Sequence, residues 1–216
     1  MDFKDFAIRI SKIKNLPLPG EASHLKMAPE FRLEELRRAR AANRNPKQAG
    51  VMALFYPKGQ DRTHLLLIQR KSHPKDVHSN QIGFPGGKME KSDEDLRATA
   101  IRETYEEVGV PMDRIEVVRG FSEIYIPPSN FEVQPFMGLY RNPEPFIAQE
   151  SEVAALIEVP LEEVLSNANL YTENLTTSYA KNVSVPAFKL NGHTVWGATG
   201  MMLSEIRAML KEVLGN

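Results

Sequence analysis

Three glutamates within five positions form the strongest chemical feature of this chain: Glu103, Glu106 and Glu107. Side chains three and four positions apart on an α-helix are neighbours, with Cβ atoms about 5–6 Å apart, so a helix here crowds three carboxylates together. Bound Mg²⁺ or Mn²⁺ would relieve the repulsion, since both ions prefer carboxylate oxygens. The fragment alone is more typical of a solvated helix face, so its neighbours decide between the two interpretations.

The residues around these glutamates favour a metal site. Arg102 lies next to them and can pair with Glu106 or reach back to Glu94, which would hold the carboxylates in place. Upstream, Gly86 and Gly87 allow the backbone to pass close to the start of the helix, where the Gly87 carbonyl can join the ligands of the ion. The predicted metal ligands are therefore the three glutamates and Gly87.

A helix is predicted from Ser92 or Asp93, either of which can cap its start, to Val108. Gly109 then stands where a left-handed C-terminal cap is favoured. At about 100° per residue, this helix has a core side and a separate side that carries the three glutamates. The residues assigned to the core side are Arg97, Ile101, Thr104 and Val108.

Strands and further helices alternate along the rest of the chain. Apolar or β-branched segments predict strands over residues 51–57, 63–70, 115–126, 131–140 and 151–160. A short helix is expected after Pro160, and residues 199–215 have the apolar stripe of an amphipathic helix. This order predicts an α/β fold in which helices cover both faces of a mixed sheet.

The N-terminal region predicts helices of its own. Phe3, Phe6 and Ile8 begin an amphipathic helix, which the LPLPG run at residues 16–20 ends, and a second helix is expected over residues 31–43. We therefore divide the chain into an N-terminal helical extension, residues 1–46, and a single domain, residues 47–216.

Composition excludes several classes of protein. The 216 residues carry a formal net charge of −1, so no overall field draws the chain to nucleic acid or to an anionic membrane. The sequence has no cysteine, which excludes disulfides, thiolate catalysis and cysteine-type zinc sites. The N-terminus lacks the continuous apolar run of a signal peptide or a membrane span, and the cytoplasm is the expected compartment. A homodimer is a reasonable expectation, because cyclic dimers are the commonest homo-oligomers.

The segment from Gly83 to Val110, GFPGGKMEKSDEDLRATAIRETYEEVGV, resembles the Nudix box of the Nudix hydrolase superfamily. The similarity is carried by a glycine pair, an acidic residue and the run Arg102-Glu103-x-x-Glu106-Glu107-x-Gly109-Val110. The resemblance implies a Nudix-like α/β/α sandwich with a mixed β-sheet, N- and C-terminal helices around it, and metal-dependent hydrolysis of a diphosphate bond.

The box departs from the usual pattern in two places. Thr104 stands where the family usually has an aliphatic residue, and one extra residue separates Gly87 from Arg102. Because of that extra residue, either Asp93 or Glu94 can be the first acidic residue of the box.

A lengthened box is also similar to that of the coenzyme A pyrophosphatase branch. The stretch from Leu65 to Gly87 resembles the upstream motif of that branch, although Ile68 and Asn80 replace residues that are usual there. The resemblance implies coenzyme A or acyl-coenzyme A as substrate, cut to 3′,5′-ADP and 4′-phosphopantetheine or its acyl derivative. The predicted substrate-binding residues are Arg70, Lys71, Lys75, His78, Gly86 and Gly87.

Glu152 lies just ahead of a predicted strand, in the region from which some superfamily members supply a general base. Glu107 or Glu152 is therefore the candidate to take the proton. The predicted catalytic residues are Glu103, Glu106, Glu107, Arg102 and Glu152. Phe131, Phe136 and Trp196 are interpreted as core residues rather than as a ligand platform.

Two alternative functions stay open. The first keeps the chemistry but changes the substrate to another nucleoside diphosphate derivative, such as ADP-ribose, NADH or a dinucleoside polyphosphate. The second is a nucleotide-binding module that retains the fold without turnover. Such a module would be expected to lose metal-ligand carboxylates, whereas Glu103, Glu106 and Glu107 are all present.

Overall fold

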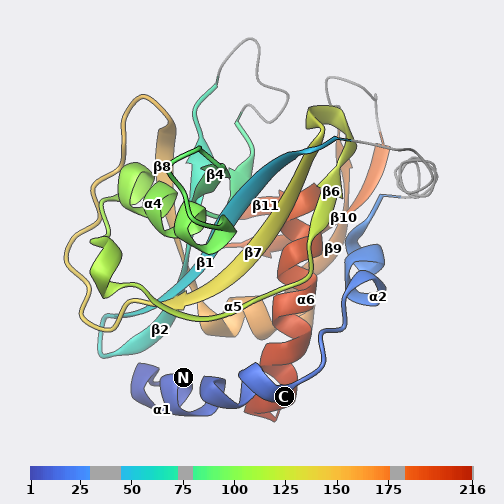
Figure 1. Ribbon diagram of the computed structural model, residues 1–216. Helices are drawn as coiled ribbons and strands as arrows, with labels where there is room; N and C mark the ends of the chain where they lie inside the picture. Colours follow the sequence, from blue (N-terminus) through green and yellow to red (C-terminus); the bar gives the residue numbers. More distant parts are fainter. Residues whose placement is uncertain (30–44, 73–79, 176–182, 216) are drawn as a thin grey trace.

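A mixed β-sheet forms the centre of the protein (Figure 1). The computed structural model describes residues 1–29, 45–72, 80–175 and 183–215. Within these ranges, the main sheet has eight strands in the order β3-β2-β1-β7-β5, while β4 pairs with β1, β6 with β7, and β8 with β2. The strands are β1 Lys47–Lys58, β2 Arg62–Arg70, β3 Ile82–Gly83, β4 Gly86–Lys88, β5 Glu116–Gly120, β6 Ile124–Ile126, β7 Phe131–Leu139 and β8 Val153–Pro160. β1 and β7 run parallel, and β1 and β2 antiparallel, so the sheet is mixed as predicted.

Helices cover both faces of this sheet. Along β1, Met52 and Leu54 are buried in one cluster with residues of α4, Leu96–Val108, while Ala53 and Phe55 are buried in a second cluster with residues of α6, Gly197–Leu214. Successive side chains of a strand point to opposite faces, so the alternation places α4 and α6 on opposite sides of the sheet. The predicted α/β/α sandwich is confirmed.

A second sheet, not expected from the sequence, precedes α6. It contains β9 Leu170–Leu175, β10 Val183–Leu190 and β11 His193–Trp196, paired antiparallel in the order β11-β10-β9. The short helix predicted after Pro160 is present as α5, Leu161–Leu165. Because β11 ends directly before α6, the small sheet fixes where that helix begins.

The N-terminal segment packs against α6. It contains α1 Phe3–Ile10, α2 Glu21–His24 and the 3₁₀ turns Ser11–Asn15 and Leu25–Met27. Asp2 caps α1 by accepting hydrogen bonds from the backbone N–H groups of Lys4 and Asp5. Phe3 and Phe6 lie in the same buried cluster as the α6 side chains, whereas Ile8 is 71% exposed and does not belong to the apolar face.

Two N-terminal expectations have no structural test. The helix predicted over residues 31–43 lies outside the described residues. The division of the chain at residue 46 stays a prediction. Among the described helices, none is both long and apolar enough to cross a bilayer.

Glu205 of α6 joins three parts of the fold. Its side chain is fully buried and accepts hydrogen bonds from the Gly20 backbone N–H (2.8 Å), the Ser122 backbone N–H (3.0 Å) and the Ser122 hydroxyl (2.7 Å). His24 Nε2 lies 3.2 Å from the same carboxylate. Residues 115–126 were predicted as one strand but form two, β5 and β6, because Ser122 between them bonds to Glu205 rather than to a neighbouring strand.

Candidate active site

α4 begins later than predicted and ends where predicted. Its N-cap is Asp95, whose side chain accepts a hydrogen bond from the Ala98 backbone N–H, rather than Ser92 or Asp93. Gly109 forms the C-cap with a left-handed backbone, φ 74°, as expected. Asp93 cannot cap the helix, because its carboxylate is engaged by the Glu90 backbone N–H at 2.9 Å and the Thr99 hydroxyl at 3.0 Å.

Arg102 is the centre of a network of acidic side chains. Its Nε and Nη2 donate to the two carboxylate oxygens of Asp93, at 2.9 and 3.0 Å. Its Nη1 donates to Glu103 Oε1 and to Glu106 Oε2, both at 2.9 Å. These hydrogen bonds from Arg102 hold the pKa of the Asp93 carboxyl well below its usual range. The structure thus decides the register left open by the extra residue: Asp93, rather than Glu94, pairs with the arginine.

Glu107 is the most deeply buried of the three glutamates. Only 2% of the residue is exposed, and its Oε2 accepts a hydrogen bond from the Gly86 backbone N–H at 2.8 Å. Burial raises the pKa of the Glu107 carboxyl to about 8, although the Gly86 hydrogen bond and the nearby Arg70 guanidinium oppose this shift. Arg70 Nη1 lies 3.9 Å from Glu107 Oε1. A divalent cation nearby would favour the ionised carboxylate.

Two glycines of β4 allow close approaches, Gly87 to the Glu103 carboxylate and Gly86 to the backbone of β1. A Cβ on Gly87 would lie 2.5 Å from the Glu103 carboxyl carbon, so a side chain there would displace the carboxylate. Gly86 has φ 150°, and a Cβ there would lie 2.5 Å from the Gly50 carbonyl oxygen. Gly87 therefore leaves room for the Glu103 carboxylate, and Gly86 lets β4 lie close against β1, where its N–H reaches Glu107.

Glu103, Glu106 and Glu107 converge less closely than their spacing predicts. Glu103 and Glu107 line one cavity, whereas the Glu106 side chain is 51% exposed and turned toward Arg102. The physical reason is that Glu106 and Glu107 lie about 100° apart around the helix. Glu107 therefore joins the buried side of α4, while Arg97, which was assigned to that side, is exposed.

The carboxylates suit a hard divalent ion in kind. Mg²⁺ and Mn²⁺ prefer carboxylate oxygens. Burial raises the pKa of the Glu103 carboxyl, as it does for Glu107, although Arg102 opposes the shift. In the described ranges, however, no group of three or more acidic or histidine side chains surrounds one point. Arg102 holds Glu103 and Glu106, and Gly86 holds Glu107. The donor types thus fit the predicted ion, but a shared site needs these side chains to rearrange.

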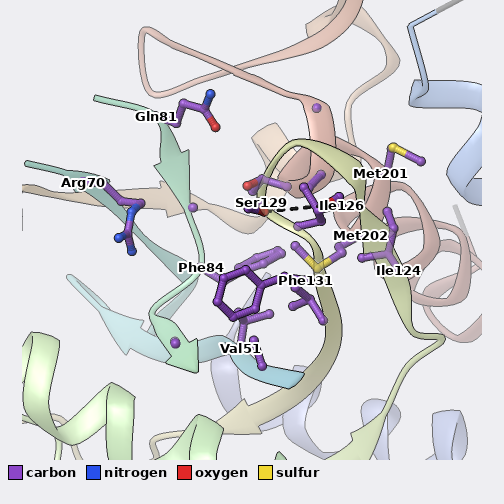
Figure 2. Close-up of a pocket in the computed structure, with 18 of the residues that line it drawn as sticks. Val51, Arg70, Gln81, Phe84, Ile124, Ile126, Ser129, Phe131, Met201 and Met202 are labelled. Carbon is purple, nitrogen blue, oxygen red and sulfur yellow. Dashed lines mark hydrogen bonds between the residues drawn. The ribbon is translucent and has the colours of Figure 1, made fainter. Parts of the chain in front are cut away.

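The cavity beside these residues has a volume of about 450 Å³. The charged residues of its wall are Arg70, Lys88, Glu103, Glu107 and Glu152, whereas β1, β6, β7 and α6 supply mostly apolar side chains. Figure 2 shows Arg70 on one side of the cavity, with Ile124, Met201 and Met202 on the other. The cavity therefore joins a charged region to an apolar one, as small-molecule sites commonly do.

Comparison with known proteins agrees with this architecture. A model of the NUDIX domain matches residues 44–178 of the chain. The chain belongs to the Nudix family. Two relatives named uncharacterized Nudix hydrolase NudL are similar to it. The protein of Pectobacterium atrosepticum is 30% identical over 154 residues, 69% of this chain and 77% of the relative. That of Yersinia pestis is 32% identical over 142 residues, 66% of this chain and 70% of the relative.

A solved structure supports the fold as well. The crystal structure of RenU, a Nudix hydrolase from M. smegmatis, matches with a TM-score of 0.50 and 18% identity, covering 79% of this chain and 86% of that one. The family membership and the α/β/α sandwich confirm the resemblance drawn from the Nudix box.

The structure distributes the predicted site residues of this Nudix chain unevenly. Arg70, Gly86, Gly87 and Glu152 line the cavity together with Glu103 and Glu107. The Lys71 ammonium instead donates to the Glu150 carbonyl at 2.6 Å, and Lys71 does not line the cavity. Lys75 and His78 lie outside the described residues.

Several residues that line the cavity were not predicted from the sequence to do so. Phe131 and Trp196 were interpreted as core, but both are only partly buried and line the cavity; Phe136 is buried in the core as expected. The pair Pro127-Pro128, which reads as a turn, also lines it. Apolar residues of a core and of a ligand pocket have the same composition, so sequence held no signal that separated them.

Proposed function

We propose that this Nudix protein hydrolyses the diphosphate bond of coenzyme A or acyl-coenzyme A with the help of Mg²⁺ or Mn²⁺. The products are 3′,5′-ADP and 4′-phosphopantetheine or its acyl derivative. One observation carries the proposal: the carboxylates of Glu103, Glu107 and Glu152 meet Arg70 at a cavity whose other walls are mostly apolar. Such a cavity suits a diphosphate that has a long uncharged arm.

Glu103, Glu106, Glu107 and the Gly87 carbonyl are the proposed ligands of the ions. When bound, Mg²⁺ or Mn²⁺ neutralises the diphosphate and lowers the pKa of an attacking water. Arg102 positions Glu103 and Glu106, because its guanidinium is fixed by Asp93 at one end and donates to both glutamates at the other. Asp93 and Arg102 thus fix the positions of two proposed ligands, Glu103 and Glu106, before an ion binds.

Glu152 is the proposed general base. It lines the cavity and is exposed, so water can reach it. Its negative charge contributes to raising the pKa of both the Glu103 and the Glu107 carboxyls, which places it in the same electrostatic environment. Glu107 is less suited to take the proton, because one of its oxygens already accepts the Gly86 N–H.

Arg70 is the proposed phosphate-binding residue. Its backbone N–H donates to the Gln81 carbonyl at 2.9 Å, which anchors the end of β2, and its guanidinium lies at the cavity beside Glu107. A guanidinium can donate two parallel hydrogen bonds to one phosphate. Lys71, Lys75 and His78 stay predictions for the same role.

The test is a substrate panel resolved by product. The purified protein is incubated with Mg²⁺ or Mn²⁺ and coenzyme A, acetyl-coenzyme A, ADP-ribose, NADH or a diadenosine polyphosphate. We expect cleavage of the first two to 3′,5′-ADP and the pantetheine product. Preference for a substrate without the pantetheine arm would reject the coenzyme A proposal and keep the hydrolase. Cleavage of none would favour a binding module.

Glu106→Gln tests the metal assignment. The Glu106 side chain is half exposed, so the fold should survive while turnover falls by orders of magnitude. Glu212→Gln is the matched control, since Glu212 is an exposed helical glutamate on α6, far from α4 in sequence. Wild-type turnover in Glu106→Gln would remove Glu106 from the proposed ligands.

A further inference from the structure

The cavity has an apolar compartment, which we define by the following residues: Val51, Phe84, Ile124, Ile126, Phe131, Trp196, Ala198, Met201 and Met202. Figure 2 shows Val51, Phe84, Phe131 and Met202 grouped together, with Met201 farther out. We infer that the apolar compartment binds the uncharged arm of the substrate, which is the pantetheine with its acyl group. The nucleotide end then lies on the Arg70 side. This inference rests on the proposed function.

Charge decides the orientation. Arg70 and Lys88 are the cationic side chains among the described cavity residues, and they come from β2 and β4 beside the carboxylates. None of the residues that define the apolar compartment carries a charge. The 3′,5′-ADP end keeps a terminal phosphate, and an unpaired phosphate in an apolar space is strongly disfavoured. The pantetheine arm is uncharged and meets no such penalty.

Hydrogen bonding points in the same direction. The Thr199 hydroxyl, at the edge of the compartment, donates to the Ile82 carbonyl at 2.9 Å. The Tyr125 hydroxyl donates to Asn130 Oδ1 at 3.0 Å. Specific recognition of an adenine needs a few well-placed polar groups. These two hydroxyls already serve the fold, and the only polar side-chain group among the residues that define the compartment is the Trp196 indole N–H. The compartment is therefore better suited to an aliphatic chain than to a base.

The residues that line the apolar compartment also suit acyl chains of more than one length. Met201 and Met202 are unbranched and adapt their shape to the group they contact. Each methylene that leaves water for the compartment should tighten binding roughly fourfold, equivalent to about 0.8 kcal/mol. We expect KM to fall from coenzyme A to acetyl- and hexanoyl-coenzyme A.

Two fragments without a diphosphate test the orientation independently of turnover. S-hexanoylpantetheine and 3′,5′-ADP are titrated separately into the full chain, by calorimetry. Trp196 is the single tryptophan and lines the compartment, so its emission should shift with the hexanoyl fragment. Ala198→Phe places a ring in the compartment, and Ala208→Phe makes the same change on α6 outside the cavity.

We expect Ala198→Phe to weaken binding of S-hexanoylpantetheine at least tenfold, to leave 3′,5′-ADP binding within twofold, and to raise KM for hexanoyl-coenzyme A. Ala208→Phe should match the wild type. Loss of 3′,5′-ADP binding alone in Ala198→Phe would show the opposite orientation and overturn the inference. If Ala198→Phe does not fold, a wild-type KM independent of acyl length, with no change in Trp196 emission, would overturn it equally.

Failure of this inference is distinguishable from failure of the proposed function. If the wild type cleaves coenzyme A but Ala198→Phe binds both fragments normally, the inference is wrong and the function stands. If the wild type cleaves neither coenzyme A nor hexanoyl-coenzyme A, the proposed function is wrong. Selective loss of S-hexanoylpantetheine binding in Ala198→Phe would then still support the assignment of the apolar compartment as an acyl-binding site.

Discussion

The Gly86 backbone N–H donates to the buried carboxylate of Glu107 at 2.8 Å, and this contact joins β4 to α4 below the cavity. It stabilises a negative charge that burial disfavours, and burial has the larger effect, since the pKa of Glu107 is raised to about 8. The most buried of the proposed metal ligands thus also keeps its proton to a higher pH than an ordinary carboxyl, because burial raises its pKa. Protons and divalent ions should compete for Glu107.

The first prediction is a pH-dependent stability of the metal-free protein. Because the folded pKa of Glu107 lies above the unfolded value of 4.5, its contribution is complete below about pH 4.5 and is lost as pH rises through 8. The slope from one proton is at most about 1.4 kcal/mol per pH unit. Urea midpoints in chelator at several pH values measure it, and Glu107→Gln, which cannot ionise, should flatten the curve.

Millimolar Mg²⁺ supplies the control for this prediction. A cation favours the ionised carboxylate, so it should restore stability at pH 8 in the wild type and much less in Glu107→Gln. Parallel curves for the two proteins between pH 5 and 8 would show that Glu107 does not carry the effect.

The second prediction concerns which acidic residue serves Arg102. Asp93→Asn removes the charge that fixes the guanidinium through two hydrogen bonds, so turnover should fall about 10–100-fold, as for other residues that orient metal ligands. Glu94→Gln, one position later and exposed, should leave stability within about 0.5 kcal/mol and turnover unchanged. Steady-state kinetics on the two variants side by side decide the question, and equal losses would contradict the pairing.

The third prediction uses the close approach of Gly87 to Glu103. Gly87→Ala puts a Cβ 2.5 Å from the carboxyl carbon of a flexible side chain, so the carboxylate should move while the fold is retained. We expect weaker Mn²⁺ binding and at least tenfold lower turnover, with little change in thermal midpoint. Gly83→Ala is the control, because its nearest atom would be the Thr199 hydroxyl oxygen at 3.9 Å. Unchanged Mn²⁺ affinity in Gly87→Ala would separate Glu103 from metal binding.

The fourth prediction addresses Glu205, which has no part in the proposed chemistry. In Glu205→Gln, one uncharged amide oxygen replaces a carboxylate that accepts several hydrogen bonds. We expect the free energy of unfolding to fall by roughly 3 kcal/mol. Burial raises the pKa of the Glu205 carboxyl, but hydrogen bonds from His24, Ser122 and Gly20 outweigh it and lower the pKa overall, so the contribution of Glu205 is present above the unfolded pKa and is lost as pH falls. Denaturant unfolding measures the loss; an unchanged midpoint would contradict the role assigned to this carboxylate.

Local sequence patterns predicted the elements that depend on nearest neighbours. Gly109 ends α4 because a left-handed cap needs only a glycine at that position, and β1, β2, β7 and β8 follow from short apolar runs bounded by turn residues. The Nudix box was recognisable because its residues are contiguous in the chain. β9, β10 and β11 were missed, since their partly exposed or interrupted apolar patterns are weak over so few residues.

Contacts between distant segments decided the rest. The choice between Asp93 and Glu94, the turn of Glu106 toward Arg102 and the burial of Glu107 under Gly86 depend on how β4 packs against α4. Phe131 and Trp196, 65 positions apart, line one cavity only because β11, which ends at Trp196, packs against β3 of the sheet that contains β7. The spacing of residues in the sequence gives only their angular positions around the helix axis. Burial and charge pairing depend on all the segments that pack around that helix.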